Sequence, residues 1–118
     1  MKNLNYLKLK NQLPENVNLL AVSKYSNTKN IQSLYDLGQE HFGESRVQEA
    51  QIKQFDLRNN QNLKWHFIGK IQSNKIIKIV KNFDYIHSVD SLRKLQKISK
   101  AAIELNKIPK IMIQIKLS

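Results

Sequence analysis

The sequence contains no cysteine, only three glycines and two prolines, and no run of 18 apolar residues. Without cysteine there is no disulfide framework, no thiolate nucleophile and no cysteine-ligated zinc or iron–sulfur site. The glycines, Gly38, Gly43 and Gly69, are far apart, so neither the GxGxxG fingerprint nor a Walker loop is present. The amino terminus interleaves Lys and Asn with apolar residues, which predicts neither a secretory signal nor a membrane span. These absences are consistent with a cytoplasmic protein.

Positive charge is abundant, because 20 Lys and Arg face 9 Asp and Glu and give a net charge of +11. Lysine supplies 17 of these cations and is spread along the chain, and Ile and Asn are enriched as well. Recognition of bases and phosphates draws on the bidentate fork of arginine, of which there are only three. Compositional drift explains the charge better than a nucleic-acid-binding surface. A basic nucleic-acid-binding module is therefore kept only as a second alternative function.

Short apolar runs alternate with amphipathic stretches along the chain. Five runs are predicted strands: 18–24, 41–44, 63–69, 85–89 and 110–117. Four connecting helices are predicted over 28–37, from 45 to about 57, from 73 or 74 to 83, and over 91–107. The polar segment before the first strand is compatible with one more helix. Strand–helix–strand units repeated every 20 to 26 residues or so, at about the spacing of βαβ units, indicate a parallel sheet.

Two helix ends carry capping signals. Ser45 with Gln48 three residues later forms a capping-box pattern at the start of the second helix. Gly38 stands where the C-terminal cap of the first helix belongs.

Side-chain patterns set two further expectations. In the helix after residue 73, four apolar side chains are expected to face inward: Ile76, Ile77, Val80 and Phe83. In the fifth strand one face carries Lys110, Met112, Gln114 and Lys116, and the other carries Ile111, Ile113, Ile115 and Leu117. One apolar face against helices and one mixed face are typical of a barrel strand.

The fold class is α/β, and two closures of the sheet compete, an open doubly wound sheet or part of a (β/α)8 TIM barrel. The absence of glycine between the first strand and its helix removes the best evidence for a nucleotide-binding open sheet. The chain stops directly after the fifth strand, whereas a closed barrel of eight units needs about 200 residues or more. We therefore expect residues 1–118 to be the amino-terminal portion of a single barrel domain, truncated after its fifth strand.

Lys24 is the first candidate for chemistry. It stands at the carboxyl end of the first predicted strand, the end at which α/β folds place their active sites. A lysine held by an apolar strand loses hydration, which favours the neutral amine that Schiff-base chemistry needs. From the residues alone, a lysine that extends its amine from a strand end into solvent explains the position better.

The histidines and carboxylates have weaker claims. His41, His66 and His87 lie on successive predicted strands without metal-ligand spacing, so buried histidines satisfied by hydrogen bonds are the simplest interpretation. No metal site is predicted. Asp84 and Asp90 flank the fourth predicted strand and Glu44 ends the second, where helix capping explains them better than a carboxylate pair for acid–base chemistry.

Five segments, in this order and spacing, closely resemble the pyridoxal 5′-phosphate (PLP) homeostasis protein family: LLAVSKYS (19–26), FGESRVQEA (42–50), WHFIGKIQSNK (65–75), IHSVDS (86–91) and IMIQIKLS (111–118). That family consists of single-domain fold-type III PLP binders, similar to the amino-terminal barrel of alanine racemase. The resemblance implies that PLP is the cofactor and that Lys24 forms the internal aldimine, a Schiff base, with it. Ser45 and His66 are implied as residues that line the cofactor pocket.

The sequence also departs from the family pattern. Where the family often has Asn in a GEN motif after the second strand, this chain has Ser45. Where the family commonly has Asn in its fifth strand, this chain has Lys116. The family's Ser- and Gly-rich phosphate motif and its arginine near the pyridine nitrogen lie late in the barrel, and neither is present in these residues.

The resemblance implies a carrier and regulator in intracellular vitamin B6 homeostasis, without an established catalytic activity or catalytic residue. PLP is the expected partner, with amino acids or PLP-dependent apoenzymes as further candidates. The first alternative is a PLP-dependent, racemase-like enzyme acting on amino acids. Such an enzyme needs a second acid–base residue opposite the lysine, and Tyr25 is the one candidate in the sequence.

Overall fold

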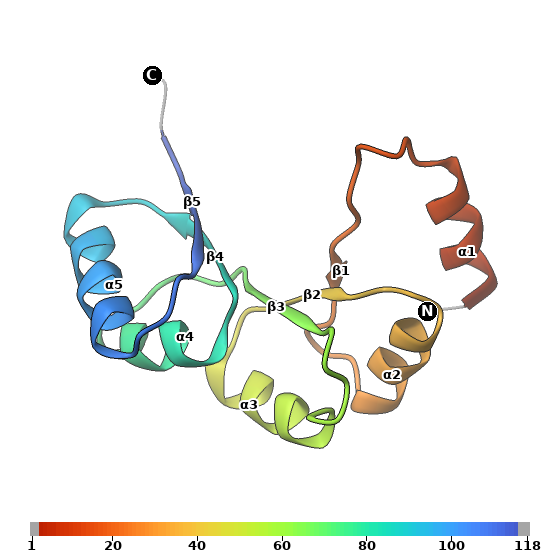
Figure 1. The fold of residues 1–118 in the computed structure, drawn as a ribbon, viewed down its shortest axis with the longest axis horizontal. Helices are drawn as coiled ribbons and strands as arrows, with labels where there is room; N and C mark the ends of the chain where they lie inside the picture. The colour runs from red at the N-terminus through yellow and green to blue at the C-terminus, as the bar shows by residue number, and fades with distance from the viewer. Residues whose placement is uncertain (1–2, 116–118) are drawn as a thin grey trace.

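The computed structural model describes residues 3–115, which form one curved parallel sheet with helices along its outer side (Figure 1). The strands are β1 (Ala21–Val22), β2 (His41–Glu44), β3 (Lys64–Phe67), β4 (Tyr85–Val89) and β5 (Lys110–Ile113). They lie side by side in chain order, and each pairs in parallel with the next. A barrel has this unbroken order, whereas the order of a doubly wound sheet reverses. The prediction of an α/β fold with part of a TIM barrel is confirmed.

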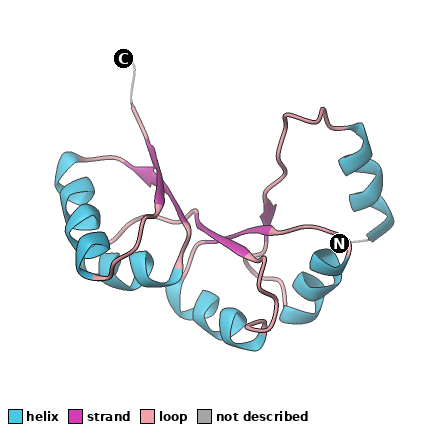
Figure 2. Ribbon diagram, in the orientation of Figure 1, coloured by secondary structure: helices cyan, strands magenta, loops and turns pink. Residues whose placement is uncertain are grey.

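The helices are α1 (Asn3–Gln12), α2 (Thr28–Asp36), α3 (Val47–Asp56), α4 (Ile76–Asn82), which continues the short 3-10 helix η1 (Ser73–Lys75), and α5 (Leu92–Glu104). Figure 2 shows α2 to α5 following the convex side of the sheet, while no described helix covers the concave side. The helix expected before the first strand is α1, and it lies against α2. The Tyr6 hydroxyl donates to Oε1 of Gln39, in the loop between α2 and β2, at 2.9 Å. None of the described helices combines the length and apolar character that a membrane crossing requires.

The hydrophobic core lies between the convex face of the sheet and these helices. Alternate strand positions point toward it, as the two-residue period of a strand requires, and Phe42, Phe67 and Ile86 are buried there. The helices contribute side chains three or four positions apart, among them Ile31, Leu34, Ala50, Ile79, Val80 and Ile98. Because the core occupies the convex side, the concave face remains for polar side chains.

One residue predicted to face inward from α4 does not. Ile77 is 62% exposed, and Ile79 is buried instead. The helix buries positions 76, 79 and 80, which follow the i, i+3, i+4 rule of a single apolar face, and Phe83, directly after the helix, is buried as well. Ile77 lies about 100° further round the helix from Ile76 and therefore points to solvent.

The two capping predictions have different outcomes. The prediction at Gly38 is confirmed. This residue follows α2 at a φ of +106°, a backbone conformation that residues with a Cβ rarely adopt, and its N–H donates to the Tyr35 carbonyl at 2.9 Å. The capping box at Ser45 is wrong, because α3 begins at Val47 and its cap residue, Arg46, makes no side-chain capping bond. Ser45 lies one residue too early to cap the helix.

The fifth strand is covered less than expected. Ile111 is half-buried, but Ile113 and Ile115 are 57% and 75% exposed. The pairing of β4 with β5 shifts register between Ile86 and Val89, where Ser88 has a φ of +61°. β5 is also the edge strand of the described sheet, and no described helix follows it. The expectation that the apolar face of this strand lies against helices is therefore wrong for Ile113 and Ile115, while Lys116 and Leu117 lie outside the described residues.

Candidate functional site

The carboxyl ends of β1, β2 and β3 meet at one rim of the sheet. Val22 pairs with Gly43, and Glu44 pairs with Phe67, so the residues that follow each strand emerge at the same edge. Lys24 follows β1 by two residues, and Ser45 directly follows β2. The structure therefore brings these two predicted site residues to the same end of neighbouring strands.

Lys24 is exposed, and its Nζ lies 5.9 Å from the centre of the Tyr25 ring. No hydrogen bond or ion pair holds this amine within residues 3–115. This exposure agrees with the interpretation that the residues alone favoured, a strand-end lysine that extends its amine into solvent, and not with a dehydrated lysine, because β1 is an edge strand and no described neighbour covers Lys24. Tyr25, the one candidate for a second acid–base group, is 79% exposed at a φ of +67°.

His66 lies on β3 between two other histidines on the concave face. Its Nε2 is 2.9 Å from His41 Nδ1, and its Nδ1 is 2.9 Å from His87 Nε2. The Tyr85 ring stacks on the His66 ring, with centroids 4.0 Å apart and planes 2° from parallel. Both ring nitrogens of His66 are thus engaged by other histidines, and no described bond joins it to Lys24 or Ser45.

Burial first, and then the charges that His87 and His41 would carry, lower the pKa of His66 from 6.5 to about 4. Burial also lowers the pKa of His87. At neutral pH the central imidazole, that of His66, is therefore neutral: its single N–H donates to one neighbouring histidine, and its other ring nitrogen accepts from the other histidine. Within the described part of the chain, no group of three or more His, Asp or Glu side chains could hold a metal ion.

Acid is expected to weaken the fold through His66. Its pKa is lower in the folded chain than in the unfolded chain, so the unfolded state binds more protons as the pH falls. The contribution of His66 to the free energy of unfolding is present above pH 6.5 and is lost toward pH 4. Between pH 7 and pH 5 the free energy of unfolding should fall by about 2 kcal/mol. Urea unfolding at both pH values measures it. The His66→Phe variant keeps a ring against Tyr85 and should lose most of this pH dependence; an unchanged dependence would contradict the assignment.

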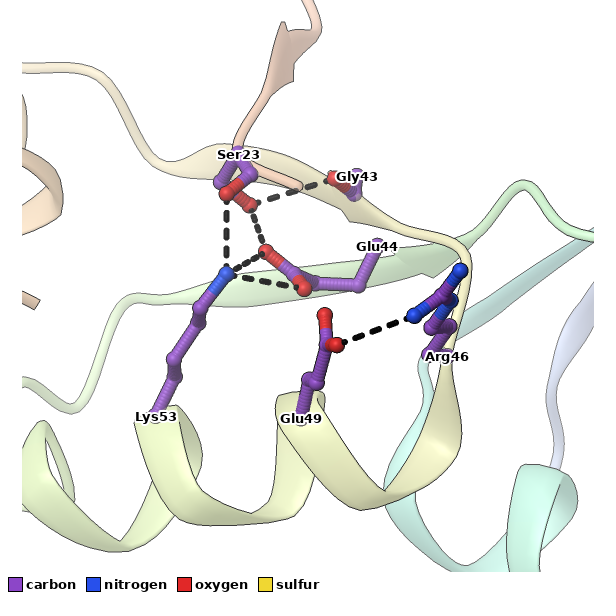
Figure 3. Close-up of polar contacts among 6 residues, drawn as sticks. All are labelled: Ser23, Gly43, Glu44, Arg46, Glu49 and Lys53. Carbon is purple, nitrogen blue, oxygen red and sulfur yellow. Dashed lines mark hydrogen bonds and ion pairs between the residues drawn. The ribbon is translucent and has the colours of Figure 1, made fainter. Parts of the chain in front are cut away.

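A buried ion pair lies directly beneath the end of β1 (Figure 3). Lys53 on α3 extends its Nζ to Glu44 at 2.9 Å from Oε2 and 3.1 Å from Oε1, and to the Ser23 carbonyl oxygen at 2.9 Å. The Ser23 hydroxyl donates to the same Glu44 carboxylate and lies 3.1 Å from the Gly43 carbonyl oxygen. Glu44 is fully buried, and Ser23 and Lys53 are 3% and 8% exposed. Among the described residues, no buried side-chain polar atom is left without a partner.

The helix-capping interpretation of the carboxylates is wrong. Glu44 binds Lys53 and Ser23 rather than a helix end, and Asp84 accepts a hydrogen bond from the Trp65 N–H at 2.8 Å. Asp90 pairs with Lys94 Nζ at 3.3 Å, while Ser91 is the cap residue of α5. Lys53 itself was not predicted as a site residue. A signal existed, because Val47, Ala50, Lys53 and Leu57 are all buried at helical spacing, and a lysine within such a stripe requires a buried acid.

The fold and the rim define the class of protein: part of a parallel (β/α) barrel that presents a lysine at the carboxyl end of its first strand. The chain belongs to the family described as alanine racemase, N-terminal domain, whose model matches residues 3–118. Among curated relatives, the pyridoxal phosphate homeostasis protein of Synechocystis sp. is 50% identical over 105 residues, covering 89% of this chain and 48% of the relative. The protein of the same name from Escherichia coli K12 is 44% identical over 82 residues, covering 68% and 35%.

Solved structures agree with these relatives. PipY of Synechococcus elongatus PCC7942, solved with PLP bound and without it, matches with a TM-score of 0.92 and 47% identity over 96% of this chain and 53% of PipY. Alanine racemase of Clostridium difficile shares the fold, with a TM-score of 0.72 at 19% identity over 92% of this chain and 29% of the racemase. The family resemblance seen in the sequence is confirmed. This chain spans about half the length of PipY and of the Synechocystis relative.

Proposed function

We propose that this chain forms the lysine-bearing part of a PLP-binding barrel that acts in PLP homeostasis, with Lys24 as the residue that holds the cofactor. The observation that carries the proposal is the position of Lys24, whose exposed amine stands at the carboxyl end of β1. The match to PipY, which has been solved with PLP bound, supports it.

The free amine of Lys24 fits the aldehyde of PLP. Lys24 would hold the cofactor through its Nζ, which would join the aldehyde carbon of PLP with the loss of one water molecule. When bound, the cofactor supplies an electron sink for amino-acid chemistry. Ser45, at the end of the neighbouring strand, and His66, on the concave face, are proposed to line the pocket.

The proposed role as a PLP carrier indicates which molecules the protein exchanges the cofactor with. A carrier of PLP exchanges the cofactor with amino acids or with PLP-dependent apoenzymes of the cytoplasm, because both offer amines that compete with Lys24 for the aldehyde. Residues 1–118 contain no Ser- and Gly-rich phosphate motif. We expect this chain alone to hold PLP more weakly than a complete barrel, since a phosphate requires several N–H donors.

Borohydride reduction of the chain mixed with PLP, followed by peptide mass mapping, tests the proposal. The stable adduct is expected on Lys24 in preference to the 16 other lysines. Lys24→Arg should remove the dominant adduct, whereas Lys29→Arg, at an exposed lysine on α2, should leave it unchanged. Adducts scattered evenly over the lysines would show that the rim does not select Lys24.

A further inference from the structure

We propose that Lys53 and Glu44 are positioning residues for Lys24, because their buried ion pair holds Ser23 and thereby sets the turn that presents the Lys24 amine. The inference rests on the proposed function of Lys24 as the residue that holds the cofactor. Neither Lys53 nor Glu44 is proposed to touch PLP.

The first observation is the shape of the chain around Lys24. The Ser26 N–H donates to the Ser23 carbonyl oxygen at 3.0 Å, which closes a β-turn with Lys24 and Tyr25 as its two central residues. Tyr25 has a φ of +67°, and a positive φ at the third position is the mark of a type II turn, where glycine or asparagine is usual. A tyrosine keeps this conformation only where its surroundings enforce it.

The second observation is how the start of that turn is held. Ser23 donates its N–H to the Gly43 carbonyl at 2.9 Å, and its hydroxyl contacts the Glu44 carboxylate. Its carbonyl oxygen accepts two hydrogen bonds, one from Ser26 and one from Lys53 Nζ. The backbone of Ser23 is thus bound to its own turn, to β2 and to α3, and Figure 3 shows its contact with Lys53 on α3.

The chemistry of the pair matches this role. The three hydrogen-bond donors of the Lys53 ammonium are all accounted for by the two Glu44 oxygens and the Ser23 carbonyl. Burying a charged pair seldom stabilises a fold more than an apolar pair of the same size would. Stability therefore does not explain why α3 carries a lysine here, whereas the bond from that lysine to the residue before Lys24 does.

The hydrogen-bond ladder between β1 and β2 is too short to hold the turn at Lys24 and Tyr25 by itself. β1 has only two residues, and its last pair joins Val22 to Gly43. Beyond that pair, Ser23 is the last buried residue before the exposed Lys24. Without Lys53, the turn loses its anchor on α3, Tyr25 can leave its positive φ, and the Lys24 amine samples a wider range of directions.

The test replaces both charges at once, because a single change would leave a buried unpaired charge. The Glu44→Met/Lys53→Met chain is expected to keep its urea midpoint near that of the wild type. The rate at which PLP becomes trapped on Lys24 by borohydride should fall about tenfold, since misdirection of a reacting group slows a reaction by this order or more. The rate at Lys29 in the same peptide map should not change.

Two further variants separate positioning from a general structural effect. Lys53→Arg keeps the charge and the donors and should retain most of the Lys24 rate. Tyr25→Gly in the double-methionine background removes the conformational penalty of the turn and should recover part of the lost rate. If the methionine pair does not fold, Glu44→Gln/Lys53→Gln gives the same comparison with a neutral polar pair.

A readout independent of PLP keeps the two proposals apart. Hydrogen exchange at the Ser26 amide, which reports the turn directly, should speed up about tenfold in the double variant. If the wild-type chain forms no preferred adduct at Lys24, the proposed function fails, and the exchange rate still tests the positioning. Unchanged exchange at Ser26 and an unchanged Lys24 rate in a folded double variant would overturn the inference.

Discussion

Replacing Lys53 alone by methionine is expected to lower the free energy of unfolding by about 3 to 5 kcal/mol. The change leaves the Glu44 carboxylate, which is fully buried, without its cation and with the Ser23 hydroxyl as its remaining described partner. The Ser23 carbonyl loses a donor in the same step. A buried charge without a partner costs far more than the hydrogen bonds themselves contribute, so the loss should be large.

A second ion pair in the same region provides the control. Arg46 and Glu49 lie 3.4 Å apart at the start of α3, with side chains 65% and 43% exposed (Figure 3). Arg46→Met should cost less than about 1 kcal/mol, because solvent screens an exposed pair. Urea unfolding of both single variants gives the comparison. Equal small effects for Lys53→Met and Arg46→Met would mean that Glu44 is less isolated from water than the structure indicates.

Gly69→Ala is expected to destabilise the fold by about 3 kcal/mol, at the upper end of what overpacking usually costs. A Cβ at Gly69 would lie 2.3 Å from the Ser45 carbonyl oxygen and 3.0 Å from the Ser45 Cα and carbonyl carbon. These are backbone atoms, so no rotamer change can relieve the overlap. The loop after β3 would have to move away from the loop after β2.

Gly43→Ala is the matched control for this substitution. Its Cβ would meet the side chain of Ile68, at 3.1 Å from Cδ1, and the end of a side chain can shift by a few tenths of an ångström. The cost should be less than half that of Gly69→Ala. Thermal or urea unfolding measures the loss of stability in the two variants. Similar losses would indicate that the loops after β2 and β3 separate easily.

The arrangement of elements along the chain could be predicted well from local patterns. The second and fourth strands, predicted over 41–44 and 85–89, have those bounds in the structure, since each is a short apolar run followed directly by a helix signal. Predictions that depended on one position within an element were less secure. Ile77 points to solvent because a single step along a helix turns a side chain by about 100°, and Ser45 misses the cap position by one residue because α3 begins at Val47.

The sequence by itself determined the α/β class, the number of strands and the family, because periodicity and motifs are properties of neighbouring residues. Tertiary structure decided the sheet order, the row of histidines on the concave face and the exposure of Lys24. It also decided the partnership of Lys53 with Ser23, residues 30 positions apart. Periodicity reports only which side of an element is apolar. Which residue of another element a buried side chain contacts depends on strand register and on how α3 packs against β2. The helical spacing of the sequence therefore indicates that Lys53 is buried, but only the fold shows which groups it contacts.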